Sequence, residues 1–153
     1  MEKKINSFLK LKWALVCRSV SVDQKTGLLS VFNVIEEICL KSKSDLPSQL
    51  VIPVDINLVI NLEVDDITSL DKLTPSLRVV ILNPDKKEIG CKDIKIDLSG
   101  INNDKLRVII GFDSFDIDDF GRYEFVICVK ENDGSVYKKI GSTSIKIEKE
   151  AQK

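Results

Sequence analysis

The chain has 153 residues, the length of one domain and enough to bury a single continuous core. Its 23 basic and 24 acidic residues are interleaved and give a formal charge of -1, a balance that favours neither nucleic acid nor an anionic membrane. Only four of the basic residues are arginines, the side chain that makes bidentate contacts with phosphates and bases. We therefore expect no nucleic-acid partner and no membrane partner.

The chain contains no histidine, and this absence bounds the chemistry that it can perform. Histidine is the side chain most often used as a general base near neutral pH, and it is the commonest ligand of transition metals. Serine-histidine and cysteine-histidine dyads are therefore excluded, and any catalysis would depend on carboxylates, lysine, cysteine or tyrosine. We expect a protein that is not an enzyme, with no catalytic residue and no cofactor.

The four cysteines, Cys17, Cys39, Cys91 and Cys128, stand far apart and include no Cys-x-x-Cys pair. Structural zinc sites need closely spaced ligands, so this spacing argues against zinc. One interpretation of each cysteine is a reactive thiol. The alternative, which we favour, is a buried free cysteine that acts as a small apolar residue. We expect all four to be reduced.

The amino-terminal residues carry no secretory signal that we can identify. Lys10 and Lys12 interrupt the first apolar stretch before it reaches the length of a signal peptide. The longest uncharged apolar runs are a few residues, far short of a membrane span. With the unpaired cysteines, these features predict a cytoplasmic protein.

Apolar residues at every second position predict that most of the chain forms β-strands. The pattern is longest from Ile52 to Val64, where one face of the strand is apolar and the other is mostly polar. In chain order, the alternation predicts about eight strands, at residues 12–22, 28–38, 50–64, 77–82, 89–98, 106–112, 123–129 and 136–148.

Turn residues separate these segments. Asp23 to Gly27 forms the first turn, and its glycine suits a positive φ in a bulged hairpin. Asn83-Pro84-Asp85 reverses the chain, since proline presets the second position of a turn. Asn132-Asp133-Gly134-Ser135 is the strongest turn signal and predicts a type I′ turn between antiparallel strands. Residues 65–75 are ambiguous, because a short helix and an ordered loop both fit the pattern.

Strands with one apolar face must pair those faces, and no long amphipathic helix is available to cover a sheet. Two sheets packed face to face are the economical solution, so we predict an all-β fold, an antiparallel two-sheet sandwich of about eight strands. A closed barrel is the alternative. We expect residues 1–153 to form this single β-sandwich domain, with short charged tails at about 1–10 and 149–153.

Segments from both halves of the chain carry a shared set of strand and turn residues. The first hairpin contains Ala14-Leu15-Val16-Cys17, the turn Asp23 to Gly27, and Ser30-Val31-Phe32-Asn33-Val34-Ile35. The later segments are Asn83-Pro84-Asp85, Phe120-Gly121-Arg122-Tyr123-Glu124-Phe125 and the Asp133-Gly134 turn. Together they resemble a family of small bacterial all-β domains of unknown function, whose first hairpin carries a Gly-x-x-Ser-(aliphatic)-aromatic-x-(aliphatic) signature. The resemblance implies an immunoglobulin-like or C2-like sandwich in a bacterial protein, and it implies no catalytic residue.

Aspartates gather in two loops, of which the later one has metal-ligand character: Asp65, Asp66 and Asp71, and then Asp113, Asp116 and Asp118. C2-type sandwiches hold calcium with aspartates on loops at one end, so a C2-like calcium- or ligand-binding domain is the alternative function. However, Phe115 and Ile117 alternate with the acids as in a strand, and no glycine provides the sharp turn of a calcium loop. We therefore favour a solvated acidic loop and expect no metal site.

Two aromatic residues are candidates either for binding or for packing. Tyr123, at the start of a strand, could be an exposed binding residue. We favour a ring in the core with its hydroxyl bonded to nearby backbone. Trp13, the only tryptophan, could anchor an interface, and we favour a core anchor of the first strand.

Missing catalytic groups and plentiful strand edges together favour a non-catalytic bacterial β-sandwich protein of unknown function, acting as a protein-protein interaction or accessory module. Its partner would be another protein, or a second copy in a homo-oligomer, bound through a sheet edge. The last hairpin, Arg122 to Glu148, is the edge that we expect, since Lys138, Lys139 and Lys146 would keep it soluble when unoccupied.

Overall fold

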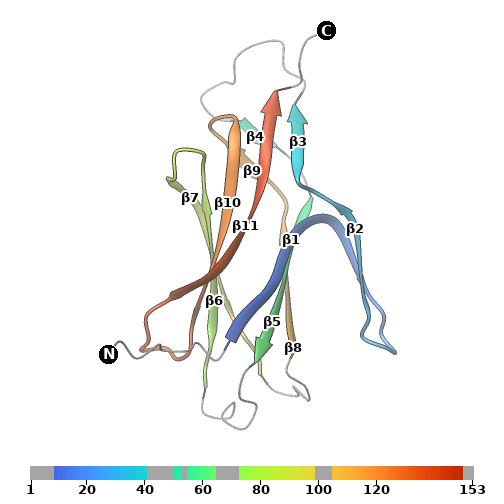
Figure 1. Ribbon diagram of the computed structural model, residues 1–153, viewed down its shortest axis with the longest axis vertical. Coiled ribbons are helices and arrows are strands. Elements are labelled where there is room, and N and C mark those ends of the chain that lie inside the picture. The colour runs from blue at the N-terminus through green and yellow to red at the C-terminus, as the bar shows by residue number, and fades with distance from the viewer. Residues whose placement is uncertain (1–8, 41–49, 53–54, 65–72, 99–104, 150–153) are drawn as a thin grey trace.

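The structure is a computed structural model that describes residues 9–40, 50–52, 55–64, 73–98 and 105–149. This described part contains strands and no helix, arranged in two main sheets that pack face to face (Figure 1). The all-β two-sheet sandwich predicted from the sequence is thus confirmed.

The described residues form more strands than the eight predicted, because several predicted strands are divided. The first sheet has the strand order β2-β1-β5-β8, the second has the order β3-β11-β10-β6-β7, and β4 pairs with β9 in a small ribbon. Neighbouring strands are antiparallel except β3 and β11, which are parallel. The strands are β1 (Leu9–Val22), β2 (Leu29–Val34), β3 (Glu37–Leu40), β4 (Leu50–Ile52), β5 (Ile56–Val64), β6 (Ser76–Leu82), β7 (Glu88–Lys95), β8 (Lys105–Phe112), β9 (Phe115–Ile117), β10 (Gly121–Lys130) and β11 (Lys138–Lys149).

The core lies between the two sheets and is built from the inward faces of strands in which apolar and polar residues alternate. On β5, Leu58, Ile60 and Leu62 are completely buried, and β10 contributes Phe125 and Ile127. Complete burial of a side chain of this size contributes about 1.5–3 kcal/mol to folding. On these two strands the apolar pattern therefore fixes which face turns inward.

A β-bulge in β1 decides the position of Trp13. The register of β1 against β5 shifts between Leu11 and Trp13. Leu11 packs on the core before the bulge, and Ala14 and Val16 belong to the core or pack on it after the bulge. Trp13 is left on the outer face of the sheet, opposite Asn61, with 38% of its surface exposed. The predicted core position of Trp13 is therefore wrong.

The predicted strand at residues 28–38 is two strands, because the chain changes sheets between Ile35 and Glu36. The N–H of Ile35 donates to the carbonyl of Val16 on β1, at 2.7 Å. The carbonyl of Glu36 accepts from the N–H of Lys146 on β11, at 2.9 Å. Consecutive residues thus pair with different sheets, and β3 continues beside β11.

Other predicted boundaries also change. The predicted strand at residues 50–64 becomes β4 and β5, and residues 53–54 lie outside the described residues. The acidic loop contains β9, which pairs with β4. Most of the ambiguous segment (65–72) and most of the predicted tails (1–8 and 150–153) lie outside the described residues.

The connection between β10 and β11 is longer than a two-residue turn and spans residues 131–137. The N–H of Ser135 donates to the carbonyl of Asn132 at 2.9 Å, which closes a β-turn. Asp133 and Gly134 lack the positive φ that a type I′ turn requires, so that part of the prediction is wrong.

The turn at Asn83-Pro84-Asp85 is confirmed. The N–H of Lys86 donates to the Asn83 carbonyl at 2.9 Å, and the N–H of Lys87 donates to the Asn83 side-chain oxygen at 2.8 Å. Asn83 is buried, so its side chain holds the turn from the inside.

Candidate interaction surface

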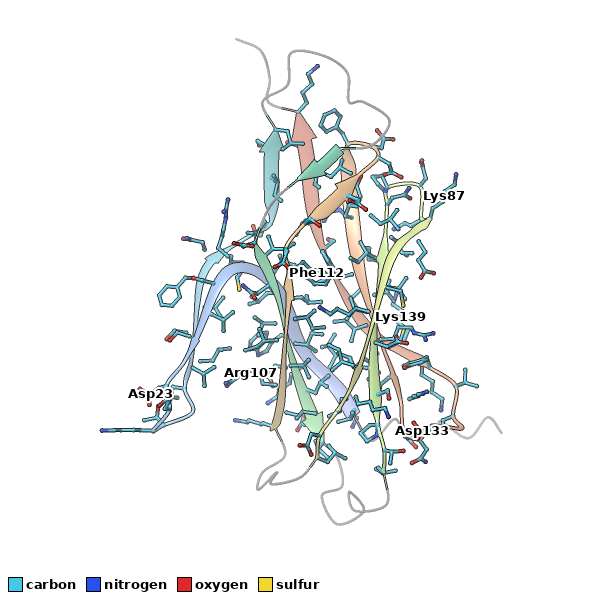
Figure 2. The ribbon with its side chains drawn as sticks, turned by 180° about the vertical axis from the view of Figure 1, so that it is seen from behind. Asp23, Lys87, Arg107, Phe112, Asp133 and Lys139 are labelled. Atoms are coloured by element: carbon cyan, nitrogen blue, oxygen red, sulfur yellow. The ribbon has the colours of Figure 1, made fainter. Side chains whose placement is uncertain are left out.

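The second half of β1 and the whole of β2 form a hairpin that bends away from the sandwich. We call residues 18–34 the arm. Figure 1 shows β1 curving over so that the arm runs beside the sheet from which it comes. Figure 2 shows Asp23 at the far end of the arm, well separated from Lys87 on the opposite side of the molecule. The arm is the part of the described structure that projects furthest from the two packed sheets.

The tip of the arm is a well-bonded turn. One carboxylate oxygen of Asp23 accepts from the N–H groups of Lys25 and Thr26, at 2.9 and 2.8 Å. These bonds, that of Thr26 above all, lower the pKa of Asp23 because they stabilise its charged form. Gly27 has the predicted positive φ, 68°, and its N–H donates to the Asp23 carbonyl at 2.8 Å. The sequence therefore predicted this turn correctly.

Two hydrogen bonds hold the arm against its own sheet. At the base, the side-chain amide of Asn57 on β5 donates to the carbonyl of Arg18, at 3.0 Å. At the tip, the guanidinium of Arg107 on β8 donates to the carbonyl of Gly27, at 3.3 Å. The arm therefore lies alongside the outer face of its sheet, with its base at β5 and its tip at β8.

Apolar side chains lie between the arm and this outer face. Cys17 and Val59 are completely buried, yet neither belongs to the core between the two sheets. The register places Leu15 on one side of Val59 and Ile109 on the other. On the arm, three apolar residues are half-buried: Val31, its partner Val20 on β1, and Leu29 at the start of β2. A second, smaller apolar cluster thus covers the outer face.

The apolar side chains that stay exposed are concentrated on this same unit. Among the residues whose side-chain burial the structure describes, seven large apolar side chains are exposed, and all except Val136 belong to the arm or to the outer face behind it. Single exposed apolar residues are ordinary on protein surfaces, whereas a concentration of them marks an interaction site. The six are Trp13, Val22, Leu28, Phe32, Val34 and Ile109.

Within the arm, β2 is an edge strand without charge. It pairs with β1 on one side, and no described strand pairs with its other side. Residues 26–35 include no charged residue. The other edge strands of the two main sheets all carry charges: Lys105 and Arg107 on β8, Lys92 and Asp93 on β7, and Glu37 on β3. Edge strands are normally protected from association by such charges, so among the described edges of the two main sheets β2 is the one that lacks this protection.

The direction of the β2 backbone groups follows from the turn. The N–H of Asp23 donates to the Leu28 carbonyl at 2.9 Å, which makes these two residues a bonded pair. Bonded and non-bonded pairs alternate along an antiparallel ladder, so Ser30 is bonded to β1. The N–H and carbonyl groups of Leu29 and Val31 therefore point away from β1, toward the open edge. Sequence reasoning missed this site, and the uncharged stretch at residues 26–35 is the signal that could have revealed it.

The expected edge, the last hairpin, is only partly an edge. β10 lies between β11 and β6, so it is central. β11 is covered by β3 over Lys146 to Lys149, and its earlier half lies beyond the end of β3. The N–H of Lys146 points toward β3, so the N–H of Ser144, two residues earlier, points to the same side and away from β10. The lysines of this strand fit a protected edge.

The aspartates of the later acidic loop do not come together as a metal site among the described residues. Asp118 instead contributes to the structure: one carboxylate oxygen accepts from the Asn83 amide at 2.7 Å, and the other lies 3.0 Å from the Tyr123 hydroxyl. These bonds, that of Asn83 first, lower the pKa of Asp118. Asp113 and Asp116 are exposed. The earlier acidic loop, with Asp65, Asp66 and Asp71, lies outside the described residues.

Tyr123 occupies the predicted core position. Its ring is completely buried. Its hydroxyl donates to the Asp119 carbonyl at 2.7 Å and accepts from the N–H groups of Asp118 and Asp119, both at 3.2 Å. The prediction of a packed ring and a backbone-bonded hydroxyl is confirmed.

The four cysteines are free, as predicted, but they are not all buried. Cys17 is buried, Cys128 is half-buried, and Cys39 and Cys91 are exposed, which corrects the prediction for these two. Loss of hydration raises the pKa of Cys17, Cys128 and Cys91, so these thiols are less nucleophilic than an ordinary one at neutral pH.

The potential ligand atoms of Glu37, Cys39 and Glu148 lie within 4.8 Å of one another on the surface.

No model of a known protein family matches the chain, and a search of curated proteins gives no match either. The resemblance to small bacterial β-domains stays a prediction. In the part of the chain that the structure describes, no helix is long and apolar enough to cross a membrane.

Proposed function

We propose that the chain is a non-catalytic protein-binding module of a bacterial cytoplasm, and that it binds an extended segment of a protein partner by adding a strand to β2. The observation that carries this proposal is that β2 is an uncharged edge strand on a projecting arm. Strand addition draws its affinity from backbone hydrogen bonds and its specificity from side chains on alternate positions.

The groups needed for strand addition are available on β2. The open-edge backbone groups of Leu29 and Val31 offer two N–H donors and two carbonyl acceptors. Leu28 and Phe32, at 68% and 50% exposure, supply apolar surface on either side of them. An uncharged apolar edge left unoccupied is an aggregation hazard, so a partner that covers it also protects the protein.

The remaining side chains support a binding role rather than a reaction. The chain has no histidine, and burial raises the pKa of the Cys17 and Cys128 thiols. The Tyr123 hydroxyl and the Asp118 carboxylate are both engaged in holding one loop. Four free cysteines suit a reducing compartment, which supports the cytoplasmic assignment.

A matched pair of variants tests the proposal. Val31→Pro removes an N–H at the open edge without removing a bond to β1, whereas Val31→Ala trims the side chain and keeps that N–H. Each tagged variant and the wild type would be used to capture proteins from host-cell extract, after circular dichroism has shown that each is folded. We expect the wild type and Val31→Ala to retain the same partner and Val31→Pro to lose it. Equal capture by all three would contradict strand addition at β2.

A further inference from the structure

We infer that the strand added to β2 is β2 of a second copy of this chain, antiparallel and related by a two-fold axis. The two four-stranded sheets would then join into one continuous sheet. This inference rests on the proposed function and names its partner.

The absence of charge makes β2 compatible with a copy of itself. A two-fold interface brings the same surface patch of both copies together, so every charge near the axis meets its own image. Like charges placed directly opposite each other across strands destabilise the pair. Residues 26–35 bring no charge to the interface, and the turn at Asp23 and Lys25 lies beyond them.

The open-edge groups select one register. Strands pair through groups that point toward each other, which on β2 are those of Leu29 and Val31. Asn33 has a left-handed φ of 55°, so the regular part of the strand ends before it. The register that uses both open-edge residues pairs Leu29 with Val31 of the second copy. It places Ser30 directly opposite Ser30 of the second copy, at the axis.

The same register matches the exposed apolar side chains. Leu28 comes to lie opposite Phe32 of the second copy, and Phe32 opposite Leu28 of the second copy. Both side chains are largely exposed in the single chain, at 68% and 50%, and they share a face of the strand with Ser30. The other face, with Leu29 and Val31, stays half-buried against the outer face of its own sheet.

The interface is small, and two-fold pairing leaves no open β2 edge to which a third copy could add. Each copy contributes the few residues of β2 and its flanks, against about 20–30 residues in a standard interface, so we expect a weak dimer that forms at concentrations on the order of 100 µM. After pairing, the edge strands of the joined sheet are the two copies of β8, which carry Lys105 and Arg107. The assembly therefore stops at two copies.

Cross-linking at the axis tests the register directly. In this register Ser30 and its image form a non-bonded pair, the kind whose Cβ atoms lie closest, at about 4.5 Å. In a background with Cys39→Ser and Cys91→Ser, Ser30→Cys would therefore place two thiols close enough for a disulfide when oxidised glutathione accepts the two electrons. The matched control is Ser21→Cys, on the same face and paired with Ser30 on β1. In the Ser21→Cys protein, the cysteines of the two copies would lie about 14 Å apart across the dimer, because three strand spacings separate them.

We expect Ser30→Cys to give a cross-linked dimer at least about tenfold faster than Ser21→Cys, since both positions are exposed and only one lies at the axis. Equal rates would overturn the inference. Sedimentation velocity on the wild type, Val31→Ala and Val31→Pro gives the second measurement. We expect dimer in the first two and a loss of dimer in the third. A wild type that stays monomeric to several times about 100 µM, or a Val31→Pro variant that dimerises equally, would overturn it.

The two proposals fail in different ways. A monomeric wild type that still captures a different protein, in a manner that depends on Val31→Pro, would refute the second copy as partner and keep strand addition at β2. Absence of both self-association and capture would refute both proposals.

Discussion

The guanidinium of Arg107 lies 3.3 Å from the carbonyl oxygen of Gly27, although the two residues are 80 positions apart in the chain. Gly27 is at the tip of the arm, and Arg107 is on β8, the strand at the opposite edge of the same sheet. This hydrogen bond keeps the arm folded across the outer face and so fixes the direction in which the edge of β2 points.

Arg107→Ala should loosen the arm without unfolding the sandwich. An exposed hydrogen bond of this kind contributes about 0.5–1.5 kcal/mol, and the core does not depend on it. We expect faster amide hydrogen exchange in residues 19–32 and unchanged exchange in β5 and β10. Arg122→Ala is the control, because it removes an exposed arginine that bonds Ser144 on the other sheet. Unchanged exchange in the arm would show that the bond does not hold it.

Acid should loosen the same arm through Asp23. Its pKa is lowered in the folded state by the N–H bonds of Thr26 and Lys25, so folding favours the ionised form. The stabilisation is present above the unfolded pKa, about 3.9, and is lost as the pH falls through the lower folded value. Exchange of the arm amides, corrected for intrinsic rates, should therefore rise on acidification below about pH 4. Asp23→Asn should remove this pH dependence, and its persistence in that variant would assign it to another group.

Tyr123→Phe should destabilise the whole domain. The ring stays, but two N–H donors and one carbonyl acceptor in a part-buried loop lose their partner. Loss of such bonds costs about 1–3 kcal/mol, which lowers the melting temperature by several degrees. Tyr137→Phe makes the same chemical change on a half-buried ring that packs beneath Arg78, and we expect it to change little. Equal effects of the two variants would contradict the role given to the Tyr123 hydroxyl.

Two adjacent proline substitutions test the backbone directions on β11. The N–H of Ser144 points away from β10, so Ser144→Pro should cost little beyond its side-chain bond to Arg122. The N–H of Thr143 points toward β10, where Thr143 pairs with Phe125, so Thr143→Pro removes a ladder hydrogen bond and should cost about 1–3 kcal/mol. Denaturant unfolding of both proteins measures the difference. Unfolding of Ser144→Pro would mean that the strand is not open at that position.

The sequence predicted the architecture because period-two alternation reports burial directly. On β5 and β10, inward residues such as Leu58 and Phe125 are apolar at every second position, and the fold follows. The turn at Gly27 was predictable for the same reason, since its φ of 68° favours glycine.

The errors arise where the alternation is interrupted without a change in composition. The bulge before Trp13 reverses the two faces of β1, and a pattern read without it places the tryptophan inside. The change of sheets between Ile35 and Glu36 is preceded by one left-handed residue, Asn33 (φ 55°), and a single asparagine in an otherwise strand-like stretch is a weak turn signal, so one predicted strand became two.

The candidate site was missed for a related reason. Which strands lie at sheet edges depends on strand order, which local pattern does not encode. The last hairpin has the lysines of a protected edge, and its first strand proved central. The edge at β2 shows in the sequence only as an absence of charge from residue 26 to residue 35.

Amide exchange of β2, resolved by residue with nuclear magnetic resonance, tests the central claim most directly. At low concentration we expect Ser30 and Phe32 to exchange slowly, because their N–H groups bond to β1, while Leu29 and Val31 exchange fast. When the edge is occupied at high concentration or by a captured partner, Leu29 and Val31 should become slow as well. If their exchange stays fast under all these conditions while binding is observed, β2 is not the binding edge.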